Sequence, residues 1–187
     1  PSAYLVAPMA VVTNVDVSYR NNKLQTRVIG STSDYSLAWT WPVVQGSDFT
    51  EEDVKGLRNV ALIGQYLQRE LFGDEDPVGK TIRVGQSPFV ILGVLAAKGQ
   101  SLDGRDQDDT MLIPLTTAQR KVYGTPFQGS VRMIMVQAET ASGMPAVEKS
   151  MVALLRQRHR LREGVDNDFY LRNLAEVADS AAETTRT

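Results

Sequence analysis

Cysteine is absent from this chain of 187 residues, and histidine occurs once, as His159. The lack of cysteine excludes disulfide bonds and thiolate zinc sites, and it suits an oxidising compartment. A single histidine excludes a histidine metal cluster or a histidine dyad within one chain. We therefore expect no metal site of these kinds, and we interpret His159 as a solvated residue at a helix end.

Long apolar runs are missing as well. No stretch approaches the roughly 18 apolar residues that a membrane-spanning helix needs. The first ten residues, PSAYLVAPMA, lack the charged and apolar regions of a signal peptide. Because the chain opens with neither a methionine nor a leader, we expect it to be a segment of a longer protein.

An excess of one charge sign is also lacking. The chain has 20 Lys and Arg against 22 Asp and Glu, a formal net charge of −2, with the two signs interspersed. Nucleic-acid and anionic-lipid partners leave a basic patch or stripe in a sequence, and none is present. With 42% hydrophobic residues, the chain is expected to bury a core in one domain or two small ones.

Catalytic patterns do not occur either. A serine nucleophile needs an activating base and an oxyanion site, and the sequence has no GxSxG or SxxK pattern to indicate one. Residues 73–81, GDEDPVGKT, resemble a phosphate-binding P-loop, but five residues rather than four separate the glycines, and three of them are acidic. We interpret this segment as a structural turn. No enzyme activity, catalytic residue, cofactor-binding residue or cofactor is expected.

The loop 99–110 carries the best candidate ion ligands, which are Asp103, Asp106, Asp108 and Asp109. A calcium-binding EF-hand loop places carboxylates at alternating positions before a glycine and a distal glutamate, and Arg105 and Gln107 break that frame. A solvated loop is therefore favoured over a calcium site.

Alternating apolar residues predict strands at 11–19 and 24–29, joined by a turn at Asn21-Asn22. The helical spacing of apolar residues over Ile63–Phe72 predicts a helix that Gly73 ends. Apolar residues on both sides of Gly85–Pro88, which are Ile82 and Val84 before it and Phe89, Ile91 and Val94 after it, predict a hairpin that turns there. A helical turn is expected within 31–37, capped by Ser31 or Ser33.

The second half of the chain alternates strands and helices. We expect strands at 111–115 and 131–136, the latter covered on both faces because it is almost continuously apolar. Helices are expected at 116–123, capped by Thr116 or Thr117, and at 144–160. A strand at 169–171 and a helix from Ala175 complete an α+β architecture. Trp39 and Trp41 are expected to pack at a junction between subdomains rather than form an exposed recognition patch.

Three sequence blocks occur in the order of a known family: ELFGDEDPVGKTIRV at 70–84, FVILGVLAAKGQS at 89–101 and TMLIPLTTAQRKVYG at 110–124. Together they resemble the MacB-like periplasmic core domain of ABC transporter permeases, which lies between the first and second transmembrane helices. The resemblance implies a porter-like α/β subdomain of mixed sheet and helices at 1–38 and 128–187. It also implies an inserted, hairpin-rich Sabre-like subdomain at 39–127.

The function that the resemblance implies is that of a non-catalytic, periplasmic element of an inner-membrane permease. Such an element couples cytoplasmic ATP hydrolysis to periplasmic conformational change, or mechanotransmission, in efflux or in lipoprotein and peptide handling. The implied partners are the transmembrane helices, an ABC ATPase domain or subunit, a periplasmic adaptor and an outer-membrane channel, with no nucleic acid. The isolated domain is expected to be monomeric, since no strong self-association seam is present. The alternative is a free-standing periplasmic module that binds a small ligand in the cleft between its subdomains.

Two groups of site residues follow from the resemblance. The candidate partner-contact loop comprises Gln100, Ser101, Asp103, Arg105 and Asp106. The structural turn of the family motif comprises Phe72, Gly73, Pro77, Gly79 and Lys80.

Overall fold

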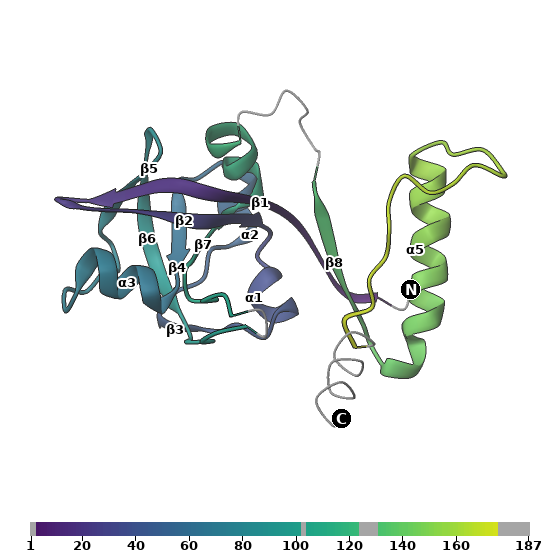
Figure 1. Cartoon of the computed structure of the whole chain (residues 1–187), viewed down its shortest axis with the longest axis horizontal. Helices are drawn as coiled ribbons and strands as arrows, with labels where there is room; N and C mark the ends of the chain where they lie inside the picture. Colours follow the sequence, from purple (N-terminus) through teal and green to yellow (C-terminus); the bar gives the residue numbers. More distant parts are fainter. Residues whose placement is uncertain (1–2, 102–103, 124–130, 176–187) are drawn as a thin grey trace. The chain divides into compact units, whose positions relative to one another are not determined.

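The structure, a computed structural model, describes residues 3–101, 104–123 and 131–175. The chain divides into two compact units, a larger one of residues 4–137 and a smaller one of residues 1–3 and 138–187. Figure 1 shows the helices and strands of both units, coloured along the sequence. No helix in the described part of the chain is long and apolar enough to cross a bilayer.

The described residues form an eight-stranded sheet in the order β2-β7-β4-β6-β5-β1-β8, with β3 added to β6. Its strands are β1 (Ala3–Tyr19), β2 (Asn22–Ser31), β3 (Val43–Gly46), β4 (Val60–Ile63), β5 (Thr81–Val84), β6 (Ser87–Leu95), β7 (Thr110–Pro114) and β8 (Met133–Ala138). Because β1 also pairs with β2, six of these strands close into a ring. The β2–β7 and β4–β6 pairs are parallel. A closed ring leaves few unpaired strand edges.

Period-two alternation gives the ring strands two apolar faces. In β2, Val28 belongs to the inner core and Ile29 to the outer one, and in β7 Met111 and Leu112 divide in the same way. The inner core collects residues from all six ring strands and is completed by Leu67 and other residues of a helix. The outer core is covered by the connections between the strands. Burying one such side chain contributes about 1.5–3 kcal/mol, so these two layers are the main source of stability.

Short helices fill the connections of the larger unit. They are α1 (Tyr35–Ala38), α2 (Glu51–Lys55), α3 (Gln65–Phe72) and α4 (Leu115–Thr117), which continues into a π-helical turn at Ala118–Val122. In α2, Thr50 and Asp53 form a capping box, in which each side chain accepts a hydrogen bond from the other's backbone N–H. The smaller unit contains a 3₁₀ turn, Ala141–Gly143, followed by α5 (Met144–Arg158).

Several sequence predictions are confirmed. The hairpin β5–β6 turns through Gly85, whose φ of 58° suits glycine, and α3 ends at Gly73 with a φ of 59°. The predicted helix 144–160 corresponds to α5. The strand predicted at 131–136 corresponds to β8, which lies beside β1, and the N–H of Arg132 donates to the carbonyl of Met9 (3.2 Å).

Other predictions are wrong. The first hairpin turns at Arg20-Asn21 rather than Asn21-Asn22, because Tyr19 pairs with Asn22 and Arg20 takes the positive φ of 52°. The strand β8 is not covered on both faces, since it lies at the end of the strand order and Met133 is 52% exposed.

Terminal elements and caps also differ from the sequence predictions. Residues 169–171 form no strand. The N-caps of α1 and α4 are Asp34 and Pro114 rather than the predicted serines and Thr116, and Thr117 stands at the N-cap of the π-helical turn without a capping hydrogen bond from its side chain. The predicted helix from Ala175 lies outside the described residues except at its start.

The predicted subdomain boundary at 38/39 falls inside the larger compact unit. On one side of it lies β2, which pairs in parallel with β7 on the other side, from Arg27 with Thr110 to Ser31 with Pro114. This pairing buries the apolar end of β2, which a two-stranded hairpin would leave open to water. The compact units therefore have other boundaries, and the division into porter-like and Sabre-like parts stays a prediction for the intact protein.

The end of α1 offers a stabilising substitution. The backbone N–H of Trp41 donates to the carbonyl of Ser36, and the backbone N–H of Thr40 donates to the carbonyl of Leu37. These bonds accompany the left-handed conformation of Thr40, which has a φ of 48°. A left-handed L-residue costs roughly 1–2 kcal/mol, and glycine avoids most of this while losing more chain entropy. Thr40→Gly is expected to raise the free energy of unfolding by about 0.5–1 kcal/mol, measured by urea denaturation.

The matched control is Thr81→Gly, at an exposed threonine of β5 whose φ is not positive. It should destabilise, because glycine weakens a strand. If Thr40→Gly lowers the free energy of unfolding as much as Thr81→Gly does, the left-handed conformation of Thr40 does not destabilise the fold.

Candidate functional site

The candidate partner-contact loop is closed at its base by one buried carboxylate. Asp108 is 8% exposed, and its two oxygens accept hydrogen bonds from the N–H groups of Lys98 (2.7 Å) and Gly99 (3.0 Å). The N–H of Gln107 donates to the carbonyl of Gly99 (2.9 Å) beside them. Asp108 therefore holds the two ends of the loop together through hydrogen bonds and is not a solvated residue.

Further hydrogen bonds continue from this base along the loop. Gln100 and Asp106 form an antiparallel bridge. Ser101 donates its N–H to the carbonyl of Arg105 (2.8 Å), and its hydroxyl reaches the same oxygen at 3.1 Å. Of the predicted contact residues, Asp103 lies outside the described residues. The structure brings the other four together on one short, hydrogen-bonded loop, and contact with a partner stays a prediction.

Lys98 anchors the loop to the two tryptophans. Its ammonium lies 5.5 Å from the ring centroid of Trp39 and 4.7 Å from that of Trp41, and it donates to the carbonyl of Trp39 (3.1 Å). Burial lowers the pKa of Lys98, while the negative charge of Asp108 opposes that shift. Trp41 is buried and donates Nε1–H to the carbonyl of Ala96 (2.6 Å). Trp41 is thus buried in the outer core and Trp39 packs against it partly buried, while their place at a subdomain junction stays a prediction.

No group of three or more His, Asp or Glu side chains able to hold a metal ion gathers in the described part of the chain. The aspartates proposed as ion ligands have other partners there. Asp106 accepts the N–H of Asp108 (2.9 Å), and Asp109 accepts the hydroxyl of Thr26 (2.7 Å). Asp103 lies outside the described residues.

The family-motif turn follows α3 and packs against β6. Phe72 and Pro77 are buried, and Gly79 donates its N–H to the carbonyl of Ile91 (2.8 Å). Lys80, the lysine of the P-loop-like segment, lies 3.1 Å from a carboxylate oxygen of Glu75. The turn therefore has structural contacts for each of these residues, as expected of a structural turn.

The tip of the β1–β2 hairpin docks on this turn, a contact that the sequence did not predict. The Tyr19 and Phe72 rings lie 4.3 Å apart between centroids. Asn22 donates its amide to the carbonyl of Leu71 (2.8 Å), which satisfies an acceptor at the C-terminal end of α3. Glu75 receives both the hydroxyl of Tyr19 (3.1 Å) and the guanidinium of Arg20 (3.1 Å). These partners lie about fifty residues apart, so no local pattern indicates them.

Glu75 makes the hairpin-tip contact sensitive to acid. Its hydrogen bond with Lys80 is the main cause that lowers the pKa of its carboxyl, and Tyr19 and Arg20 add to the effect against the opposing effect of burial. A lowered folded-state pKa contributes stability above the unfolded-state value of 4.5, and this is lost as the pH falls through the folded-state pKa. Glu75→Gln should therefore lose less stability than the parent chain on acidification below that value.

Urea midpoints measured at neutral pH and at steps below pH 4.5 test this expectation. The exposed Glu163 supplies the control, because Glu163→Gln should leave the acid dependence of the parent chain unchanged. Parallel pH curves for the parent chain and Glu75→Gln would contradict the expectation.

His159 ends α5 in the smaller unit. Its Nδ1 lies 2.7 Å from a carboxylate oxygen of Asp168, and its ring meets Phe169 edge-on at 5.8 Å. The neighbouring Arg156 donates to the carbonyls of Arg162 and Val165. The position at a helix end agrees with the sequence interpretation, while the contacts show that this end holds the following segment.

Known proteins are similar to this chain in sequence. The model of the MacB-like periplasmic core domain matches residues 1–154. A macrolide export ATP-binding/permease protein MacB from Wolinella succinogenes is 34% identical over 93% of the chain, which covers 26% of that protein. The pyoverdine export ATP-binding/permease protein PvdT from Pseudomonas aeruginosa is 32% identical over 91% of the chain and 25% of its own length. The chain thus spans about a quarter of the length of these relatives.

Two solved structures show the same fold. The periplasmic region of MacB from Actinobacillus actinomycetemcomitans superposes with a TM-score of 0.77 at 22% identity, over 97% of this chain and 77% of that one. The extracellular domain of the ABC-type transporter YknZ from Gram-positive bacteria gives a TM-score of 0.73 at 23% identity, over 87% and 79% of the two chains. With the family match over residues 1–154, the chain belongs to the MacB-like periplasmic core domain family, the periplasmic part of ABC transporter permeases of the inner membrane.

Proposed function

We propose that this domain couples cytoplasmic ATP hydrolysis to conformational change in the periplasm, and that it performs no catalysis itself. The match of residues 1–154 to the periplasmic core domain carries the proposal, together with the names of the relatives, which are ATP-binding/permease proteins. Its partners would be the transmembrane helices and an ABC ATPase domain or subunit, with a periplasmic adaptor and an outer-membrane channel. Efflux is the favoured process, with lipoprotein or peptide handling as the alternative.

The fold of the larger unit supports a mechanical role. A closed ring of strands with two apolar layers resists deformation, because packed cores change shape in discrete steps rather than continuously. The strand β1 runs for 17 residues, and its far end is fastened to the α3 turn through Tyr19, Arg20 and Asn22. A displacement applied along β1 would therefore move the ring as a body. The candidate partner-contact loop would offer its contact surface to another protein.

The intact permease provides the test. We infer that the intact permease acts as a dimer, so a spin label at Lys23, exposed on β2 near the hairpin tip, reports the distance between its two copies. We expect the distance distribution to differ between the nucleotide-free state and a state trapped with ATP. A second label pair on the ATPase domains serves as the control for nucleotide-driven closure. If the ATPase labels move and the Lys23 labels do not, the coupling role is wrong.

A further inference from the structure

A polar pocket opens where the β1–β2 hairpin is bulged. Val12 pairs with Val28 and Val15 with Thr26, so two residues of β1, Thr13 and Asn14, oppose the single residue Arg27. Asn14 takes a positive φ of 58°, which redirects the strand there. Bulges interrupt the ladder and are frequent beside binding sites. The bulge removes Arg27 from regular pairing with β1.

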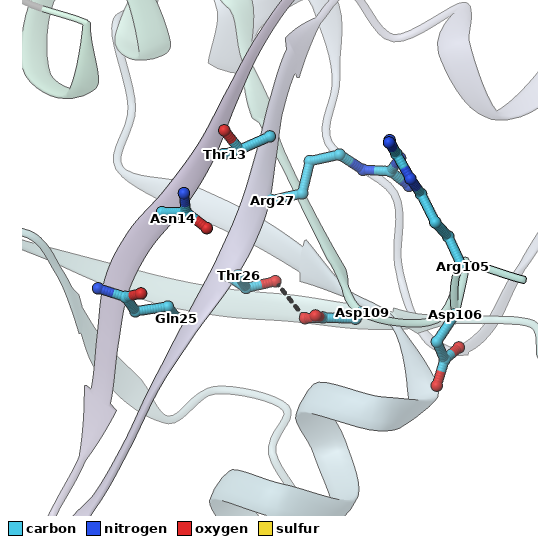
Figure 2. Close-up of a pocket in the computed structure, with 8 residues that line it drawn as sticks. All are labelled: Thr13, Asn14, Gln25, Thr26, Arg27, Arg105, Asp106 and Asp109. Carbon is cyan, nitrogen blue, oxygen red and sulfur yellow. Dashed lines mark hydrogen bonds between the residues drawn. The ribbon is translucent and has the colours of Figure 1, made fainter.

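The pocket has a volume of about 280 Å³ and lies between this bulge and the end of the candidate partner-contact loop. The hairpin contributes Thr13, Asn14 and Arg27, and the loop and its end contribute Arg105, Asp106 and Asp109. Figure 2 shows the guanidinium groups of Arg27 and Arg105 directed toward one another. Two positive groups therefore share one wall of a small polar cavity.

Arg27 is half-buried and has no acidic side chain in contact with it among the described residues. Its Nε and Nη2 both donate to the hydroxyl of Thr110, at 3.2 and 2.7 Å. Tyr35 is near enough for the Arg27 charge to oppose the rise that burial causes in its pKa, to about 12. A partly desolvated charge is normally paired with an opposite one, and here the contacts are neutral. Arg27 therefore keeps its positive charge beside neutral hydrogen-bond partners, which favours an anion next to it.

The two aspartates decide which anion fits. Asp109 is held by the Thr26 hydroxyl and Asp106 by the N–H of Asp108, so each has its own donor. With Arg27 and Arg105 they give the pocket a formal charge near zero. A dianionic phosphate would meet two carboxylates at short range, whereas a monoanion meets less repulsion. Guanidinium groups also bind carboxylates in a planar, two-point geometry.

We propose that this pocket binds a carboxylate group between Arg27 and Arg105. An acidic side chain of a partner protein and a free small carboxylic acid share this chemistry. The assignment deepens the contact role proposed for the loop, and it rests on that role only for the source of the carboxylate.

Titration of the chain, labelled with ¹⁵N at arginine, with sodium acetate at constant ionic strength tests the site. We expect saturable shifts of the Nε–Hε signals of Arg27 and Arg105. Arg105→Gln, at an exposed residue, should weaken acetate binding at least about tenfold. Arg27→Gln should do the same, and its melting temperature shows whether it remains folded. The control Arg83→Gln removes an exposed arginine of β5 outside the pocket and should bind acetate as the parent chain does.

Two peptides with blocked ends, Ala-Glu-Ala-Ala and Ala-Gln-Ala-Ala, distinguish the sources. Tighter binding of the Glu peptide than of acetate, with no binding of the Gln peptide, supports a protein side chain. Acetate binding without any gain from the peptide supports the carboxylate site and contradicts the contact role of the loop. Absence of saturable shifts, equal binding by Arg105→Gln, or displacement of acetate by a lower concentration of inorganic phosphate overturns the proposal.

Discussion

Gly64→Ala is expected to lower the free energy of unfolding of the larger unit by about 2–3 kcal/mol. Gly64 joins β4 to α3 and has a φ of −75°, so the backbone conformation itself suits alanine. The obstacle is space, because an added Cβ would lie 2.1 Å from the carbonyl oxygen of Asp108 and 2.9 Å from its carbonyl carbon. Both are backbone atoms, which cannot turn aside as a flexible side chain does.

Gly143→Ala is the matched control for this steric effect. Gly143 also has a negative φ, −81°, but its added Cβ would meet only the Thr140 hydroxyl, at 3.2 Å. We expect its stability to change by less than about 0.5 kcal/mol. Urea unfolding followed by far-UV circular dichroism reports both units, so one measurement covers Gly64 in the larger unit and Gly143 in the smaller one. Unchanged stability of Gly64→Ala would show that β4 and the loop base are not in close contact.

Local signals in the sequence predicted the local elements of the fold. Gly85 and Gly73 mark a hairpin turn and a helix end because those conformations favour glycine, and both marks were correct. The closure of the ring was not predicted, since β2 and β7 pair in parallel across about eighty residues and each looks like any apolar strand. The strand predicted at 169–171 failed for the opposite reason. A three-residue alternation is too short to indicate a strand, and Tyr170 is 91% exposed.

The sequence identified the segment that forms the candidate site, but it did not predict the contacts of the individual residues. The sequence singled out the loop and its aspartates, yet it could not separate Asp108, which holds the two ends of the loop together, from Asp106 and Asp109, which line a pocket. Carboxylates that bind backbone N–H groups and carboxylates in solvent have the same sequence signature. The sequence also gave no indication of the role that we propose for Arg27, because that role depends on a bulge in the facing strand.

Asp108→Ala should open the loop and destabilise the larger unit by about 2 kcal/mol, since the N–H groups of Lys98 and Gly99 would lose their acceptor in a partly buried place. The effect should be concentrated at the loop, because Lys98 keeps its cation–π contacts with Trp39 and Trp41. We therefore expect trypsin to cleave after Arg105 faster in this variant than in the parent chain, under conditions that leave the rest of the fold intact.

Asp108→Asn separates the loss of hydrogen bonds from the loss of side-chain volume. Its single carbonyl oxygen takes the place of only one of the two carboxylate oxygens, and the amide group cannot accept the second N–H. Stability and cleavage rate should accordingly fall between those of the parent chain and Asp108→Ala. If Asp108→Ala is cleaved after Arg105 no faster than the parent chain, the loop is held by its own internal hydrogen bonds and not by Asp108. An asparagine variant as labile as the alanine variant would instead assign the effect to the negative charge, which both substitutions remove.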